Sequence, residues 1–159
     1  MTDRQRNIAL IGFMGVGKTT IGRLLAPLVA MDFVDADTEI EKKAQMPIPH
    51  IFEQYGEGRF RCLEYEFYRE VMPSIQNTVI ATGGGAVLDA RIRAILRENA
   101  LVVYLVALPE TIFARIGGDG NRPVLSGDDK LAQITALLAE RDALYRQTCH
   151  VVVDSNNLA

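Results

Sequence analysis

The sequence has little that would build a cross-linked, metal-bound or strongly charged protein. It contains two cysteines, Cys62 and Cys149, with no C-x-x-C pair and no paired histidines, which argues against a disulfide framework and a zinc site. We interpret the two cysteines as small hydrophobic residues in a reducing compartment. Lys and Arg number 17 and Asp and Glu number 20, so the net charge of −3 gives no basic field to hold nucleic acid.

Long apolar segments are also missing. No stretch approaches the ~20 apolar residues of a membrane span, and the first ten residues, MTDRQRNIAL, are charged up to a short apolar strand, unlike a signal peptide. We therefore expect a cytoplasmic protein without a membrane partner. Hydrophobic residues make up 48% and charged residues 23% of the 159 residues, ordinary values for a globular chain. This length fits a single domain, residues 1–159, which we expect to be a monomer.

Short apolar runs alternate with stretches of helical periodicity along the chain. Strands are predicted at Asn7–Ile11, Phe33–Asp35, Thr78–Ala81, Leu101–Ala107 and His150–Val153. Helices are predicted at Lys18–Ala30, Thr38–Lys43, Ile48–Tyr55, Glu57–Met72, Asp89–Asn99, Pro109–Ile116 and Lys130–Arg146. This alternation predicts an α/β fold in three layers, with a central five-stranded parallel sheet and helices on both faces. Ligands of such sheets bind beyond the carboxyl ends of the strands.

The turn after the first strand carries a phosphate-binding motif. Its sequence, GFMGVGKT at residues 12–19, matches G-x-x-x-x-G-K-[ST] between a strand and a helix. Backbone N–H groups of the loop and the positive end of the helix attract phosphate. Lys18, whose side chain we expect to face solvent, would bridge the β- and γ-phosphates, and the Thr19 hydroxyl would be a ligand for Mg²⁺.

A glycine-rich turn without a ligand is the alternative interpretation of this motif, and the flanking strand and helix disfavour it. The glycine order, G-x-x-G-x-G, also argues against a dinucleotide site, which has G-x-G-x-x-G. The predicted nucleotide-binding residues of this segment are Gly12, Gly15, Val16, Gly17, Lys18, Thr19 and Thr20.

Two aspartates, Asp35 and Asp37, follow the second strand. In an extended segment, residues two apart face the same way, so both carboxylates could point into the site. One would hold Mg²⁺ through water, and the other would accept a proton from a substrate hydroxyl. Alternatively, Asp37 only caps a helix that starts at Thr38. The third strand ends in Thr82 and two glycines, with no other acid for this role, which favours the chemical interpretation.

The third strand runs into three glycines, Gly83, Gly84 and Gly85, which expose backbone N–H groups and let a ligand lie against the chain. A plain flexible turn is the alternative. Arg61 precedes Glu64 by three residues on a predicted helix, and a surface ion pair is the default interpretation of that spacing.

Further arginines lie around the glycine-rich segment 117–127. Arg122 lies within it, Arg115 precedes it, and Arg141 is on the helix that follows. A mobile lid with an arginine would neutralise charge on a transferring phosphoryl group and exclude water. Ordinary solvated charges are the alternative for about half of five arginines, Arg59, Arg61, Arg115, Arg122 and Arg141.

Taken together and in order, these motifs carry a family resemblance. The segments are GFMGVGKTTIGRLLA, FVDADTEIE, IFEQYGEGRFRCLE, VIATGGGAVL, VVYL, NRPVL and RDALY, which span nearly the whole chain. The chain resembles the shikimate kinases, of the P-loop group related to nucleoside monophosphate kinases. The resemblance implies a three-layer P-loop kinase fold with a lid loop. It also implies transfer of the ATP γ-phosphate to the 3-hydroxyl of shikimate, giving shikimate 3-phosphate and ADP on the path to chorismate and the aromatic amino acids.

The resemblance also implies a role for each matching residue. Lys18 and Thr19 serve ATP and Mg²⁺, and Asp35 serves the metal through water. Asp37 binds the shikimate hydroxyls and is the base. Arg61 and Arg141 hold the shikimate carboxylate, and Arg115 lies against the adenine. Arg122 is the lid arginine. The substrate pocket is lined by Gly83, Gly84 and Gly85. A small triol carboxylate does need cations to bind its carboxylate and a carboxylate side chain to bind its hydroxyls.

The chain departs from the family pattern at three places, of which His50, where the family commonly has Glu, carries little weight. Gln45-Met46-Pro47 stands where the family has Gly-x-Ser, within a substrate-binding segment expected at about 33–61. The sequence ends at Ala159, without the adenine-contacting loop and final helix that the family usually has, which bears on nucleotide affinity.

Two other functions compete with the kinase. One is a nucleotide-sensing P-loop module without shikimate kinase activity, which the complete set of acids and arginines disfavours. The other is a kinase for another small polyol acid such as gluconate. Arg61, Arg141 and the three glycines favour shikimate over it.

Overall fold

A parallel five-stranded sheet forms the centre of the molecule. The structure is a computed structural model and describes residues 6–116 and 129–157. The strand order is β2-β3-β1-β4-β5, and all neighbours are parallel. The strands are β1 (Asn7–Ile11), β2 (Asp32–Asp35), β3 (Thr78–Ala81), β4 (Ala100–Val106) and β5 (Val151–Asp154). The five-stranded parallel sheet predicted from the sequence is confirmed.

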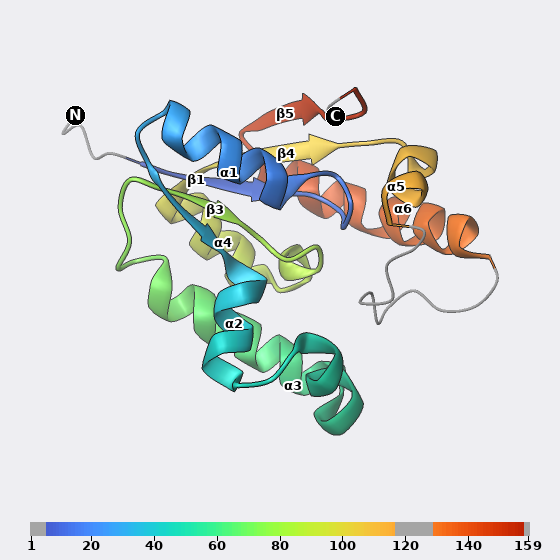
Figure 1. The fold of residues 1–159 in the computed structure, drawn as a ribbon, viewed down its shortest axis with the longest axis horizontal. Coiled ribbons are helices and arrows are strands. Elements are labelled where there is room, and N and C mark those ends of the chain that lie inside the picture. Colours follow the sequence, from blue (N-terminus) through green and yellow to red (C-terminus); the bar gives the residue numbers. More distant parts are fainter. Residues whose placement is uncertain (1–5, 117–128, 158–159) are drawn as a thin grey trace.

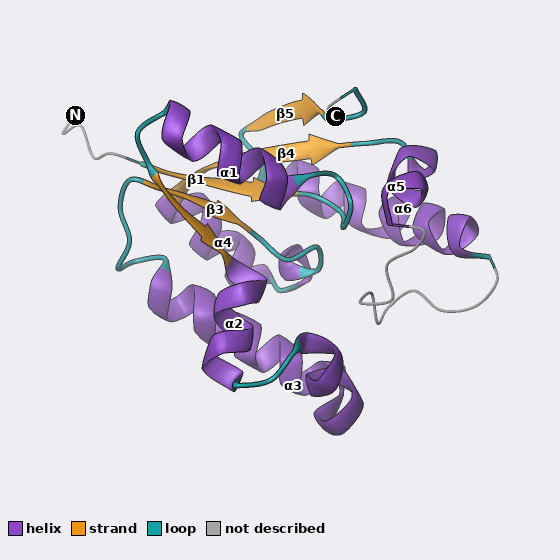
Figure 2. Cartoon of the chain, viewed as in Figure 1, coloured by secondary structure: helices purple, strands orange, loops and turns teal. Residues whose placement is uncertain are grey.

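Helices cover both faces of the sheet (Figures 1 and 2). They are α1 (Lys18–Leu28), α2 (Ala36–Ala44), α3 (Ile48–Val71), α4 (Ala90–Asn99), α5 (Pro109–Ile116) and α6 (Lys130–Thr148), with a short 3-10 helix η1 (Ala86–Leu88) that the sequence did not predict. Successive residues of β1 point to opposite faces. Leu10 packs in one cluster with Ala26 of α1, whereas Ile11 packs in another with Ile92 of α4 and Tyr145 of α6. The three-layer arrangement is thereby confirmed.

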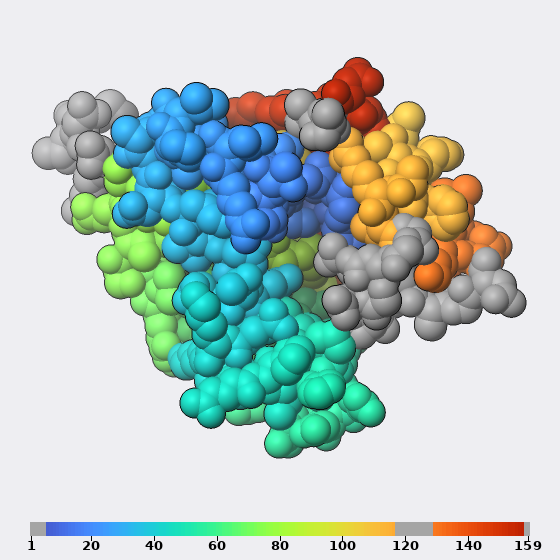
Figure 3. Space-filling view, in the orientation of Figure 1, coloured from blue at the N-terminus to red at the C-terminus, as the bar shows by residue number. Residues whose placement is uncertain are grey.

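The segment between β2 and β3 contains α2 and α3 and projects from the body of the sheet (Figure 3). The sequence predicts three helices here, and the last two, Ile48–Tyr55 and Glu57–Met72, are separated at Gly56. The structure places Gly56 inside α3 with φ 83° and ψ 171°, a backbone break that divides the helix into two parts. Glycine adopts this left-handed φ without the steric cost that a Cβ would bring.

The edge strand β5 is the least covered part of the sheet, since all four of its residues are exposed. The chain continues into Ser155, which is buried and bonded to the carbonyl of Val106 on β4. No helix follows β5 within residues 155–157. Among the helices of the described ranges, none combines the length and apolar character needed to cross a bilayer.

Asn7, the first residue of β1, ties three segments together at the amino end of the sheet. Its side-chain amide donates to the carbonyls of Ile75 (3.1 Å) and Asn99 (3.2 Å) and accepts from the backbone N–H of Thr78 (3.1 Å). The side chain is only 4% exposed, so water does not replace these bonds easily.

We expect Asn7→Ala to lower the free energy of unfolding by about 1–3 kcal/mol, because it leaves a buried N–H and two carbonyls without this partner. Urea unfolding of both proteins measures the difference. Ser74→Ala serves as the control, because the Ser74 hydroxyl also bonds a carbonyl but is exposed, and its effect is expected within about 0.5 kcal/mol. Equal losses of unfolding free energy in the two variants would contradict the assignment of Asn7 as a buried residue whose hydrogen bonds hold three segments together.

Candidate active site

Two adjoining cavities lie beyond the carboxyl ends of β1, β2 and β3. One has a volume of about 420 Å³ and is lined mainly by the loop after β1, the start of α1 and Arg115. The other, of about 380 Å³, is lined by acids, arginines, apolar side chains of α3 and the three glycines after β3. Both share the side chains or backbone of Met14, Thr19, Asp35, Asp37 and Gly84. A ligand in one cavity therefore lies next to a ligand in the other.

The loop after β1 has the conformation that the phosphate-binding motif predicts. Gly12 has φ 148°, and a Cβ there would lie 2.6 Å from the carbonyl oxygen of Leu105. Gly15 has φ 80°, and a Cβ there would lie 2.7 Å from Ile116. Both positions therefore require glycine, because of the backbone angle and of the close neighbours. The loop ends at Gly17, which caps α1, so the positive end of that helix faces the first cavity.

Lys18 does not face solvent as the sequence analysis expected. Its side chain is 9% exposed, and its Nζ donates to the carbonyls of Gly12 (2.6 Å) and Phe13 (2.9 Å). The ammonium group is therefore held against the loop that it follows. It lines the first cavity.

Thr19 and Asp35 form a pair that joins the start of α1 to the end of β2. The Thr19 hydroxyl donates to Asp35 Oδ2 at 2.6 Å, and both side chains line both cavities. Mg²⁺ in phosphate-transfer sites typically takes one or two protein oxygens and completes its shell with water and phosphate. The hydroxyl and carboxylate oxygens of this pair fit that requirement. No cluster of three or more His, Cys, Asp or Glu side chains that could hold a metal ion exists among the residues the structure describes.

Asp35, rather than Asp37, caps the second helix. Asp35 Oδ1 accepts from the backbone N–H of Thr38 at 3.0 Å, and α2 begins at Ala36, two residues earlier than predicted. Asp37 therefore lies in the first helical turn, and the alternative that it serves as the cap is wrong. The extended geometry assumed for the two aspartates is also wrong. Both side chains nevertheless line the two cavities, because β2 ends at Asp35 and α2 begins at the next residue.

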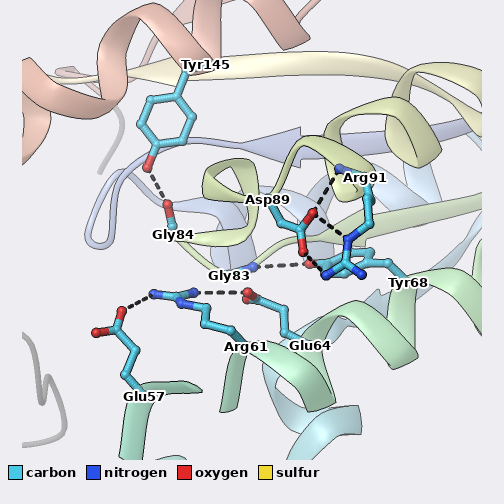
Figure 4. Close-up of polar contacts among 9 residues, drawn as sticks. All are labelled: Glu57, Arg61, Glu64, Tyr68, Gly83, Gly84, Asp89, Arg91 and Tyr145. Atoms are coloured by element: carbon cyan, nitrogen blue, oxygen red, sulfur yellow. Dashed lines mark hydrogen bonds and ion pairs between the residues drawn. The ribbon is translucent and has the colours of Figure 1, made fainter. Parts of the chain in front are cut away.

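The interpretation of Arg61 and Glu64 as a surface pair is wrong. Glu64 is 1% exposed, and its Oε1 accepts from Arg61 Nη1 at 2.9 Å (Figure 4). The other end of the Arg61 guanidinium reaches the exposed Glu57 at 3.2 Å. Arg61 Nε and Glu64 Oε2 are buried and have no hydrogen-bond partner among the described residues. Since both residues line the second cavity, these atoms remain to be satisfied by water or by a ligand.

Burial raises the pKa of the Glu64 carboxyl to about 7, although the Arg61 guanidinium beside it opposes this shift. The negative charges of Asp37 and Asp89 raise the pKa further. The carboxyl group is therefore close to half-protonated at neutral pH. The cluster thus holds both a fixed cation and an acid that can donate or accept a proton.

The glycines after β3 allow the chain to approach this cluster. A Cβ on Gly83 would lie 2.8 Å from Asp37 Oδ1 and 3.1 Å from Glu64 Oε2. A Cβ on Gly85 would lie 2.5 Å from both terminal nitrogens of Arg61. The segment is thus packed against charged side chains, and its description as a plain flexible turn is wrong. The N–H of Gly83 also donates to the hydroxyl of Tyr68 at 3.4 Å (Figure 4).

The structure brings Arg141 into the second cavity from α6, where its side chain is 5% exposed. Arg115 lies beside the first cavity, where it donates to the carbonyls of Gly15 and Val16 at 3.3 Å and of Ser155 at 2.7 Å. The predicted lid, 117–127, and its Arg122 lie outside the described residues.

Sequence reasoning missed the apolar wall of the second cavity and the buried tyrosines behind it. Phe52 and Phe60 lie on the two parts of α3 with ring centroids 5.1 Å apart, and both line the cavity. The residues that depart from the family pattern also contribute, since Pro47 is part of the wall. Glu41 accepts from the N–H of Ile48 at 2.8 Å and thereby fixes the turn that contains this proline. The family resemblance predicts the polar residues of this cavity, whereas no spacing in the sequence indicates its apolar wall.

A parallel sheet of order β2-β3-β1-β4-β5, with a glycine-rich phosphate loop after its central strand and a second cavity beside that loop, defines the fold as that of a P-loop kinase. The family model for shikimate kinase matches residues 14–159. A shikimate kinase of Nitrosospira multiformis is 46% identical over 149 residues, which cover 94% of this chain and 76% of the relative. One from Francisella tularensis subsp. novicida is 45% identical over 153 residues, 96% of this chain and 87% of the relative.

Solved structures agree with the sequence relatives. The shikimate kinase from Acinetobacter baumannii, solved in complex with shikimate, has a TM-score of 0.90 and 42% identity over 93% of this chain and 82% of its own. The shikimate kinase from Aquifex aeolicus has a TM-score of 0.81 and 33% identity over 94% of this chain and 86% of its own. The chain belongs to the shikimate kinase family, and it is an enzyme of the phosphotransferase class.

The raised pKa of Glu64 predicts a pH-dependent contribution to stability. Its contribution is complete below the unfolded value of about 4.5 and is lost as the pH rises through about 7, since the folded protein holds the proton longer than the unfolded chain. The free energy of unfolding of the wild type relative to Glu64→Gln should therefore fall by up to about 3 kcal/mol between pH 5 and pH 8. Urea unfolding of both proteins at the two pH values measures this difference.

An NMR titration of the Glu64 side-chain carboxyl carbon gives an independent readout, with an expected midpoint near 7. Two results together would contradict the prediction: a difference in unfolding free energy between wild type and Glu64→Gln that is the same at both pH values, and a midpoint near that of a solvated carboxyl. They would show that the effect of Arg61 on the pKa of Glu64 outweighs the effect of burial.

Proposed function

We propose that this protein transfers the γ-phosphate of ATP to the 3-hydroxyl of shikimate, giving shikimate 3-phosphate and ADP. One observation carries the proposal: the phosphate-loop cavity adjoins a cavity lined by the acids Asp37 and Glu64 and by the cations Arg61 and Arg141. A phosphate donor and a small hydroxy acid would therefore meet across Asp35 and Asp37. Membership in the family and the shikimate bound to the relative from Acinetobacter baumannii support this choice of acceptor. We also infer a monomer that acts in the cytoplasm, without nucleic-acid or membrane partners.

The phosphate-loop cavity is suited to ATP. The glycines Gly12, Gly15 and Gly17 and the backbone of Val16 and Thr20 would surround the phosphates, and Lys18 would leave the loop carbonyls to contact them. Thr19 and Asp35 would hold Mg²⁺, which would offset phosphate charge when bound. Arg115 joins the loop to the segment after β5, and we propose that it lies against the adenine. Arg122 is proposed to reach the phosphates from the lid.

The second cavity is suited to a polyhydroxy carboxylate. Arg61 and Arg141 would bind the carboxylate, and Gly83, Gly84 and Gly85 would line the pocket close to the ring. Phe52 and Phe60 supply an apolar wall against which the carbon ring would pack. Asp37 lines both cavities and would bind the reacting hydroxyl.

The reaction follows from this placement. The 3-hydroxyl oxygen attacks the γ-phosphorus as its proton passes to the Asp37 carboxylate. A new oxygen–phosphorus bond forms, and the bond from the γ-phosphorus to the bridging β–γ oxygen breaks. The bonding electrons remain with ADP. Lys18 and Arg122 would stabilise the charge that develops on the transferred group.

Substrate identity is tested by ADP release in a coupled assay with ATP and Mg²⁺. Shikimate is expected to support turnover, while quinate, gluconate and nucleoside monophosphates support at least about a hundredfold less, as sites built for specific polar groups discriminate by such factors. Turnover with gluconate instead of shikimate would assign a different polyol acid. ATP binding without turnover on any acceptor would favour the nucleotide-sensing module.

Asp37→Asn is expected to lower kcat by about 10²–10⁴-fold, the range typical for loss of a general base, with ATP affinity within about twofold of wild type. Asp35 caps α2, so the substitution leaves the cap intact. Asp32→Asn, an exposed site at the other end of β2, is the matched control and should leave kcat unchanged. Normal kcat in the Asp37→Asn protein would remove Asp37 from the chemistry.

A further inference from the structure

The start of α3 has no cap from its own segment. Its first residue, Ile48, follows Pro47, whose side chain cannot accept a hydrogen bond from the helix. The second residue, Pro49, has no backbone N–H of its own. The N–H of Ile48 is therefore the first one in the helix that needs a partner, and it lies in a partly buried position.

Glu41 of α2 supplies this partner across the turn that joins the two helices (Figure 1). Its carboxylate Oε2 accepts from the backbone N–H of Ile48 at 2.8 Å. Its backbone carbonyl accepts from the N–H of Met46 at 3.2 Å. One residue thus holds both the middle of the turn and the helix that follows, and its negative charge lies at the positive end of α3.

The backbone of the turn is itself unfavourable. Gln45 has φ 55° and ψ 36°, a left-handed conformation that residues with a Cβ seldom adopt. Its N–H donates to the carbonyl of Lys42 at 3.3 Å, a long hydrogen bond. The two hydrogen bonds to Glu41 therefore offset a conformation that the turn would not keep by local preference.

The segment that Glu41 holds forms part of the wall of the second cavity. Four residues of the turn and of the first part of α3 line this cavity: Pro47, Ile48, Pro49 and Phe52. None of these four lines the phosphate-loop cavity. A shift of the segment would therefore change the second cavity and leave the first one as it is.

The first part of α3, residues 48–55, is separated from the rest of the helix by the break at Gly56. It contacts the core through Ile51, which is 1% exposed, and the second part of α3 through the ring of Phe52. Residues 53–55 are exposed. Because the helix is interrupted, its second part does not set the direction of the first, and the bond at Ile48 fixes where the first part begins.

We propose that Glu41 is a positioning residue for the acceptor, whose bond to Ile48 holds residues 48–55 where they form the wall of the second cavity. This inference rests on the proposed function, because it takes that cavity as the shikimate site. A wall that is already in place needs no ordering when the ring binds, which raises affinity without changing the chemical step.

Glu41→Ala removes the acceptor of the Ile48 N–H. We expect the KM for shikimate to rise about tenfold, the effect of losing a hydrogen bond to a charged group, with kcat and the KM for ATP within about twofold. Glu39→Ala is the matched control, since it removes a glutamate of the same helix that pairs with Lys42 at 3.1 Å on the exposed surface. It should leave all three constants within about twofold. An equal rise in KM for both variants, or a fall in kcat alone for Glu41→Ala, would overturn the proposal.

Glu41→Gln keeps an oxygen that can accept from Ile48 and removes the negative charge. We expect its KM for shikimate to lie within about threefold of wild type, because a neutral acceptor keeps much of the hydrogen bond. A Gln variant as impaired as Glu41→Ala would show that the charge is required rather than the bond, and the positioning role would fail.

Amide hydrogen exchange without substrate separates this proposal from the proposed function. The N–H of Ile48 should exchange about tenfold or more faster in Glu41→Ala than in the wild type, and at the wild-type rate in Glu39→Ala. The same Ile48 rate in Glu41→Ala and wild type would overturn the positioning role, even if KM rises, because Glu41 would then act on the acceptor directly. A wild-type enzyme inactive on shikimate would overturn only the proposed function, since the exchange rates still show whether Glu41 holds the segment.

Discussion

The arrangement of the site depends on one constraint, the contact between the segment after β3 and the charged side chains of α2 and α3. Asp37, Arg61 and Glu64 lie within van der Waals reach of positions 83 and 85, where there is space for hydrogen but not for a methyl group. The strand that supplies this segment is fixed in the sheet, so the charged residues are held against a rigid edge. The position of the second cavity beside the phosphate loop follows from this contact, because Gly84 touches that loop from the other side.

This packing has an energetic cost. Burying Glu64 beside Arg61 removes water from both groups, and the raised pKa of Glu64 indicates that the attraction of the pair does not fully compensate. A buried atom on each partner lacks a hydrogen bond within the described part of the chain. Buried polar atoms without a partner are rare in native proteins, and water or a bound ligand can satisfy them. The energetic cost therefore lies at the place where the proposed acceptor would bind.

Much of the architecture was predictable from the sequence, and the failures have physical causes. The buried strands and the phosphate loop depend on local patterns, and these were predicted correctly. The boundary of α2 was wrong because Asp35, a residue with two roles, caps the helix as well as lining the site. Glu64 and Lys18 were assigned to the surface because a charged residue carries no local sign of burial, which other elements bring about. The hydrogen bond from the Tyr145 hydroxyl to the Gly84 carbonyl joins residues distant in sequence and could not be derived from spacing.

The break at Gly56 has a consequence for how the family could diversify. It separates α3 into a part with Phe52, which forms one side of the apolar wall, and a part with Phe60 and the charged pair Arg61 and Glu64. The helix is therefore two segments joined at Gly56, which contact each other through the rings of Phe52 and Phe60. Substitutions in residues 48–55 can reshape one side of the wall for a differently sized ring, while Phe60, Arg61 and Glu64 stay on the part of α3 that follows the break. Natural variation in acceptor preference is expected to accumulate before the glycine, and an engineer seeking a new polyol acid substrate would randomise there first.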